Sequence, residues 1–191
     1  MTTSRNNRAG YPLTQTQTGI YAGSLGSDSP SIYHISFLIY MPDAEASRLA
    51  AAVDRVAEAY PVLGASIRQD ENGVPVMVPP AENVATEVVT CGEKELMENQ
   101  AALVEPFDLD GGRLARFKVY DIGKKVYLLL DIHHSIFDGA SHKVFMAQLY
   151  RAYYGEPLDK ENISAFGLCE REVGERASEA LDNDREVYRT R

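Results

Sequence analysis

Two neighbouring segments, RLARFKVYDI and VYLLLDIHH, constrain the fold of this chain more than any other feature of its sequence. The short polar turn GKK joins them, and this arrangement predicts an antiparallel β-hairpin. The second segment has a continuous apolar centre, which is typical of a strand with neighbouring strands on both sides. We therefore expect a sheet organised around residues 126–134.

Further strands are predicted where β-branched and aromatic residues gather. SIYHISFLIYM covers residues 31–41, and ATEVVT covers residues 85–90. GASIRQ and VPVMVP, residues 64–69 and 74–79, read as two strands on either side of the turn DENG. Together with the hairpin, these segments predict a mostly antiparallel sheet.

The clearest predicted helix lies between residues 42 and 61. Its apolar positions follow helical spacing: Ala46, Leu49, Ala50, Val53, Ala57 and Tyr60. Asp43 is the expected N-cap, and Pro61 ends the pattern. Other helices are expected over residues 14–25, 93–106 and 141–155. The apolar face expected for the last of these is Val144, Phe145, Leu149, Ala152 and Tyr153. Helices mixed with strands predict an α/β fold, an α+β sandwich in which helices flank the sheet.

Composition narrows the classes of partner. The net charge is −9, from 19 basic and 28 acidic residues, which argues against nucleic acid because phosphates need concentrated Lys and Arg. No apolar run has membrane-spanning length, and MTTSRNNRAG lacks the apolar core of a secretory signal. Cys91 and Cys169 lack metal-type spacing and are expected to be free thiols. We expect a cytoplasmic protein without membrane contact.

The segment HHSIFDG, residues 133–139, ends the expected interior strand and precedes a helix. Side chains alternate along a strand, so His133 and His134 should point to opposite faces. One of them can then face a cavity, while the other packs or bonds to the loop. Gly139 allows a close backbone approach or a positive φ. Asp138 has three open roles: to orient a histidine, to pair with a cation, or to brace the loop.

An imidazole in this place can accept a proton from an attacking amine or hydroxyl, because it titrates near neutral pH. Ser135 follows the pair, but nothing around it resembles a nucleophile elbow, which favours direct transfer between two bound substrates. A metal site is not favoured, because the nearby His142 and Asp131 lie on other elements. His142 is expected to be exposed in a first helical turn. His34, inside a strand, is expected to pack or to lie on the surface, and a structural role for the His pair itself remains the alternative to catalysis.

HHSIFDG resembles the HHxxxDG motif of the condensation domains of nonribosomal peptide synthetases, which share the chloramphenicol-acetyltransferase-like fold with related acyltransferases. Other segments follow the family's order: PLTQTQTGIY, YPVLGASI, EPFDLDGGRLARF and ASHKVFMAQLYRAYYGEP. The matching positions in these segments include Gln17, Ile20, Tyr21, Phe107, Asp108, Leu109, Gly112, Leu114 and Arg116. The likeness covers residues 11–191.

Three positions depart from the family pattern. Gly19, Ala59 and Gly64 stand where the motifs carry arginines. In the family, the arginine at the position of Gly64 is thought to pair with the motif aspartate, so Asp138 lacks its expected partner. Arg68 and Arg116 are candidates to replace it. The departures leave open a divergent subtype, an altered activity or a degenerate domain.

The resemblance implies one lobe of a two-lobed domain. Residues 1–10 are expected to be disordered, and residues 11–168 to form the N-terminal lobe. Residues 169–191 are expected to form a charged helix that leads toward a C-terminal lobe, which this sequence lacks. Half of each substrate channel would then be missing, and we expect the chain alone to be inactive.

The activity implied by the resemblance is amide-bond formation between an upstream acyl or peptidyl thioester and a downstream aminoacyl thioester. Peptidyl carrier proteins would hold both substrates on phosphopantetheine, and no cofactor would be bound directly. Further partners would be the C-terminal lobe and adjoining synthetase domains. His134 would take a proton from the amine or position it, and His133 and Asp138 would shape the loop. Gly139 would leave room for substrate and offer its N–H to the oxyanion.

Two other activities stay open for a chain of this kind. One is a stand-alone acyltransferase of the same superfamily, which would use acyl-CoA and a small alcohol or amine. The other is a degenerate, non-catalytic lobe on which a carrier protein docks.

Overall fold

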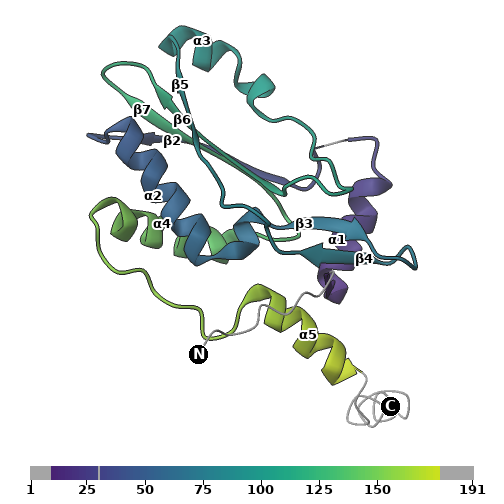
Figure 1. Ribbon diagram of the computed structural model, residues 1–191. Coiled ribbons are helices and arrows are strands. Elements are labelled where there is room, and N and C mark those ends of the chain that lie inside the picture. Colours follow the sequence, from purple (N-terminus) through teal and green to yellow (C-terminus); the bar gives the residue numbers. More distant parts are fainter. Residues whose placement is uncertain (1–9, 30, 177–191) are drawn as a thin grey trace, which may run out of the picture.

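The computed structural model describes residues 10–29 and 31–176 (Figure 1). Its strands are β1 Tyr11–Pro12, β2 His34–Met41, β3 Ser66–Gln69, β4 Pro75–Val78, β5 Glu87–Thr90, β6 Ala115–Asp121 and β7 Val126–His133. Its α-helices are α1 Gln15–Leu25, α2 Ala46–Ala59, α3 Glu93–Glu98, α4 Gly139–Tyr153 and α5 Ala165–Arg176. Two 3₁₀ turns, η1 Pro61–Gly64 and η2 Gln100–Leu103, complete the elements. The predicted disorder of the N-terminus, up to residue 9, and the predicted helix beyond residue 176 lie outside the described residues.

The larger sheet has four strands in the order β2-β7-β6-β5. The predicted hairpin is confirmed, because β6 and β7 pair antiparallel with Ala115 opposite Ile132 and Asp121 opposite Val126. β2 pairs antiparallel with the other edge of β7, so β7 is the interior strand that its apolar centre predicts. β5 is parallel to β6, which leaves the sheet mostly antiparallel.

A smaller sheet, in the order β1-β4-β3, lies beside the larger one (Figure 1). Its hairpin of β3 and β4 is the one predicted around DENG, and Gly73 supplies the positive φ of 76° that the turn needs. Ile67 and Met77 pair across it and are fully buried. Phe166 of α5 packs beneath this sheet, with its ring 5.2 Å from that of Tyr11.

Helices cover both faces of the larger sheet. α2 and α4 pack against one face, where Leu128, Leu130 and Ile132 of β7 are fully buried. On the opposite face, Leu129 joins Leu96 of α3 in a second cluster. β7 is therefore buried on both sides, which explains why its sequence is apolar without alternation.

Three local predictions are corrected by the structure. Asp43 does not cap α2, because it has a φ of 58° in the turn after β2; the Glu45 side chain caps instead, accepting from the backbone N–H groups of Ser47 and Arg48. The helix predicted over residues 93–106 ends at Glu98 and is followed by a 3₁₀ turn. Val144 is 51% exposed rather than on the buried face of α4.

Truncation of Leu128 to alanine should lower the free energy of unfolding by about 3 kcal/mol, since Leu128 is 0% exposed between the sheet and the two helices. Urea denaturation measures this change. Leu168→Ala is the matched control: its side chain is 49% exposed, and the expected change is within about 0.5 kcal/mol. Equal losses in the two variants would contradict the packing described for β7.

Candidate active site

The loop between β7 and α4 carries the histidine motif, and Asp138 anchors it to the helix. Asp138 is the N-cap of α4, and its Oδ1 accepts from the backbone N–H and the hydroxyl of Ser141, both at 2.7 Å. These hydrogen bonds lower the pKa of Asp138. Of the three roles left open for this residue, the structure shows loop bracing.

His133 is the buried member of the pair, with 2% of its surface exposed. Its Nδ1 lies 2.8 Å from the Ser135 hydroxyl, and its Nε2 lies 3.0 Å from the hydroxyl of Ser24 on α1. The rings of Phe107 and His133 form a T-shaped pair with centroids 5.9 Å apart. Burial first, and the nearby histidines second, lower the pKa of His133 to about 4. A neutral imidazole therefore ties the end of β7 to α1.

His134 leaves the strand and is exposed. Its backbone N–H donates to the carbonyl oxygen of Tyr33 at 2.8 Å, which holds the main chain while the imidazole faces outward. The predicted separation of the two rings is confirmed, because one is buried in the loop's hydrogen bonds and the other is accessible. His134 is therefore the ring of the pair that lies open to solvent.

Gly139 begins α4 and is exposed. Its φ is not positive, so of the two roles expected for Gly139 the close backbone approach is the one left. A Cβ atom added at Gly139 would meet no atom within 4 Å. The position is therefore open to solvent, next to the loop that carries His134.

Gln17, the glutamine of the first matching segment, joins three elements. Its Nε2 donates to the carbonyl oxygen of Ser135 at 3.1 Å, inside the histidine loop. Its Oε1 accepts from the backbone N–H of Thr14 at 2.9 Å and from the thiol of Cys169 on α5 at 3.4 Å. Gln17 thus links the histidine loop to α1, and through α1 to α5. Cys91 and Cys169 are free thiols, as predicted.

A buried ionic cluster next to His133 was missed by the sequence analysis. Asp131 is 0% exposed; its Oδ1 lies 2.9 Å from Nδ1 of His34 and accepts from the hydroxyl of Ser36 at 2.7 Å. Its Oδ2 lies 3.2 Å from the Arg116 guanidinium. A charged residue inside an apolar interior strand requires a partner, and this signal in VYLLLDIHH pointed to the cluster. The expected packing role of His34 is confirmed.

Phe107 covers this cluster. Its ring stacks on His34 with centroids 4.4 Å apart, and the Arg116 guanidinium lies 4.5 Å from the ring centroid. Arg116 therefore does not replace the missing partner of Asp138, because it forms ion pairs with Asp131 and Glu105. Arg68 does not pair with Asp138 either; its side chain lies against Gly111. Across residues 10–29 and 31–176, Asp138 forms no ion pair.

The three departures from the family pattern differ in their surroundings. Gly19 and Ala59 are exposed, and a Cβ atom at Gly19 would meet nothing within 4 Å. Gly64 is buried, and a Cβ atom there would lie 2.9 Å from Cβ of Pro80 and 3.3 Å from Cγ2 of Val84. In this chain, Pro80 occupies the space that a side chain at position 64 would need.

His142 was expected to be exposed, and this prediction is wrong. The ring is half-buried against Phe37 of β2, with centroids 4.4 Å apart, and its buried Nε2 has no hydrogen-bond partner among the described residues. Phe37 lies on the edge strand β2 and packs against the ring of His142 from α4. The position of His142 in the first turn of a helix does not by itself predict this contact. Within the described part of the chain, no three His, Cys, Asp or Glu residues gather to hold a metal. No helix in that part is long and apolar enough to cross a membrane.

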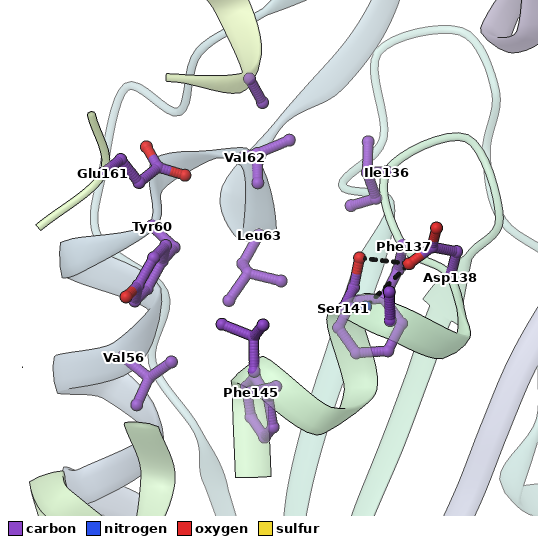
Figure 2. A pocket seen from close by; sticks show the side chains of 13 residues that line it. Val56, Tyr60, Val62, Leu63, Ile136, Phe137, Asp138, Ser141, Phe145 and Glu161 are labelled. Carbon is purple, nitrogen blue, oxygen red and sulfur yellow. Dashed lines mark hydrogen bonds between the residues drawn. The ribbon is translucent and has the colours of Figure 1, made fainter. Parts of the chain in front are cut away.

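A cavity of about 400 Å³ lies beside the histidine loop (Figure 2). Its walls come from the end of α2, from η1, from the loop and from the first turns of α4. Asp138 and Ser141 line it on one side, and His134 does not line it. The cavity and the exposed imidazole are therefore separate features of the same loop.

Comparison with known proteins identifies the family. The model of the condensation domain family matches residues 7–186. Surfactin synthase subunit 2 of Bacillus subtilis (strain 168) is 31% identical over 157 residues, which make up 80% of this chain and 4% of that protein. Tyrocidine synthase 3 of Brevibacillus parabrevis is 31% identical over 151 residues, 78% of this chain and 2% of that protein.

Solved condensation domains share the fold. The domain from the monacolin K polyketide synthase MokA aligns with a TM-score of 0.80 at 18% identity, over 96% of this chain and 43% of that chain. The first condensation domain of the calcium-dependent antibiotic synthetase, in complex with a substrate analogue, aligns with a TM-score of 0.71 at 21% identity, over 93% of this chain and 46% of that chain. The architecture is thus that of one lobe of the chloramphenicol-acetyltransferase-like fold, as the resemblance implied.

The chain belongs to the condensation domain family. It spans a few per cent of the length of the curated relatives and a little under half of the solved domains.

The buried His133 predicts a specific pH dependence of stability. The unfolded imidazole takes up a proton below its ordinary pKa of 6.5, whereas the folded one stays neutral until about pH 4. The stabilisation that depends on a neutral His133 is fully present above pH 6.5 and is lost as the pH falls toward 4. The free energy of unfolding should drop by about 3 kcal/mol at most over this range. Urea denaturation across this range should show a shallower decline for His133→Gln than for the wild type. His142→Gln removes a histidine that is not among those lowering the pKa of His133, and it should keep the wild-type slope; the same slope in all three proteins would contradict a buried neutral His133.

Restoring the family arginine at position 64 should destabilise this chain. Gly64→Arg forces Pro80 to move, and we expect a loss of about 1–3 kcal/mol in the free energy of unfolding. Ala59→Arg is the matched control, because Ala59 is exposed and the expected change is within about 0.5 kcal/mol. Thermal or urea denaturation of both variants measures the difference. A Gly64→Arg protein as stable as the wild type would show that the site has room for the side chain.

Proposed function

We propose that this chain is the N-terminal lobe of a condensation domain that joins an upstream acyl or peptidyl thioester to a downstream aminoacyl thioester. The observation that carries the proposal is the exposed imidazole of His134 on a loop whose main chain is held from several sides. Groups that act on a reacting atom need such a rigid support, because a small displacement lowers the rate steeply.

In the proposed reaction the amine of the aminoacyl thioester attacks the carbonyl carbon of the upstream thioester. A C–N bond forms, the C–S bond breaks, and the thiolate of the upstream phosphopantetheine leaves. His134 accepts the proton that the amine loses, or positions the amine for attack, and the proton passes to the departing thiolate. Atoms and charge balance without an oxidant, a reductant or a metal.

A covalent enzyme intermediate is not needed in this scheme. Ser135, the nearest hydroxyl in the sequence, is 5% exposed and hydrogen-bonded to His133. Its burial, rather than its hydrogen bond, argues against a role as nucleophile, because a substrate carbonyl cannot reach an enclosed hydroxyl. The open surroundings of Gly139 support the proposed space for substrate, and the adjacent first turn of α4 supplies the positive end of a helix for the oxyanion.

The proposed partners follow from this chemistry. Two peptidyl carrier proteins would present the substrates on phosphopantetheine in the cytoplasm, with no cofactor bound directly by this lobe. Residues 11–168 would form the lobe, and the segment 169–191 would lead toward a C-terminal lobe and further synthetase domains; α5 begins slightly earlier, at Ala165. Similarity to surfactin and tyrocidine synthases supports this setting. The chain alone is expected to be inactive.

A second candidate is a non-catalytic lobe on which a carrier protein docks. The crowding at Gly64 favours it, because Asp138 is left without the ion pair expected in the family. A stand-alone acyltransferase that uses acyl-CoA would need the same imidazole, and the gene's neighbouring adenylation and carrier domains would distinguish it from a synthetase.

Substitution of His134 by alanine in the full-length protein should reduce amide product by at least about 100-fold, the usual contribution of a general base. Single-turnover assays with two loaded carrier proteins measure this rate. Lys143→Ala, an exposed change on the first turns of α4, is the matched control and should keep wild-type turnover. If His134→Ala retained full product formation, the docking function would replace the catalytic one.

A further inference from the structure

The cavity shown in Figure 2 has the dimensions of a ligand site. Its volume of about 400 Å³ falls within the range of small-molecule pockets, roughly 300–1,000 Å³. Apolar side chains form most of its wall, among them Val56, Leu63, Ile136 and Phe145. An aliphatic chain bound here would remove its apolar surface from water, which is favourable.

The charged side chains that line the cavity are all acidic. Asp138 and Glu161 stand on opposite sides of it, and none of the thirteen lining residues is Lys, Arg or His (Figure 2). The two hydroxyl groups of the lining, those of Ser141 and Tyr60, donate to Asp138 and to the carbonyl oxygen of Asp159. The lining therefore offers hydrogen-bond acceptors and negative charge, while its hydroxyl hydrogens are already used.

Each carboxylate retains capacity for a new donor. The two hydrogen bonds that Asp138 accepts from Ser141 both fall on Oδ1, and a carboxylate offers further acceptor sites on its second oxygen. Glu161, in the segment just before α5, makes no hydrogen bond or ion pair with another described residue. A donor that reaches either side of the cavity meets an acceptor without displacing a protein contact.

We propose that this cavity binds an aliphatic amine in its cationic form, with the alkyl chain among the apolar side chains and the ammonium group at Asp138 or Glu161. Charge complementarity selects the cation: a carboxylate of the same length would bring a third negative charge between the two, and an alcohol would gain hydrogen bonds without the charge. The site shares Asp138 with the histidine motif but does not include His134, so binding there can be measured apart from the proposed amide chemistry.

Three probes of equal chain length test the proposal on the 191-residue chain: hexylamine, 1-hexanol and hexanoate, titrated at neutral pH and low salt with calorimetric or NMR detection. We expect hexylammonium to bind about tenfold more tightly than hexanol, a difference of about 1.4 kcal/mol, and hexanoate to bind more weakly than hexanol. The preference should shrink as salt is added, because the two carboxylates lie at the accessible edge.

Two variants locate the site. Glu161→Gln should reduce the affinity for hexylammonium several-fold while leaving that for hexanol unchanged. Ala165→Phe, which places a large ring in the cavity, should abolish binding of hexylammonium; circular dichroism confirms that each variant is folded. His134→Ala should bind hexylammonium as the wild type does, which separates this test from that of the proposed function.

Several outcomes would overturn the proposal. They are the absence of hexylammonium binding at millimolar concentration, equal affinity for the three probes, tighter binding of hexanoate, or full binding to a folded Ala165→Phe protein. Equal affinity would show a generic apolar surface, such as one covered by another part of a larger protein. Binding to the filled variant would place the amine elsewhere on this acidic chain.

Discussion

The end of β7 at His133 is the constraint on which the rest of this structure depends. A strand buried on both faces encloses the last side chain that it carries, whereas the next residue, in the loop, can face outward. His133, still in the strand, is enclosed and bonded to Ser24 and Ser135, whereas His134, one residue later, is outside. The main chain that carries the accessible ring is held through the burial of its neighbour, because the contacts that hold His133 also hold the loop.

The surrounding elements act on that loop from different directions. Gln17 bonds to the carbonyl oxygen of Ser135, Asp138 caps α4, and the N–H of His134 bonds to the segment before β2. Each bond involves main chain or a cap, so the loop is supported without use of the exposed imidazole. A site arranged in this way can lose or alter its chemistry while the lobe keeps its fold.

Burial of the charged Asp131 side chain costs free energy of desolvation. A carboxylate that is fully buried in an interior strand requires partners, and it has His34, Ser36 and the guanidinium of Arg116. This cluster uses an arginine that would otherwise be a candidate partner for Asp138. Crowding by Pro80 at Gly64 removes the other route to such a partner.

The sequence by itself determined the elements whose signals are local. The hairpin, the interior strand, the β3–β4 turn, α1 with its end at Leu25, and the separation of the two imidazoles all follow from side-chain period, turn residues and pleat geometry. The motif residues and their resemblance to a family were also legible in the linear order. These features depend on residues close together in the chain, so the linear pattern contains the information.

Only the tertiary structure decided which distant residues meet. Arg116 pairs with Asp131 instead of Asp138. The ring of His142 packs against Phe37, and Pro80 fills the space next to Gly64. Glu45 rather than the predicted Asp43 caps α2, because Asp43 has a positive φ in the turn after β2. Such contacts depend on the relative placement of strands and helices far apart in sequence. That placement is set by how the whole core packs, and no local pattern of residue types encodes it.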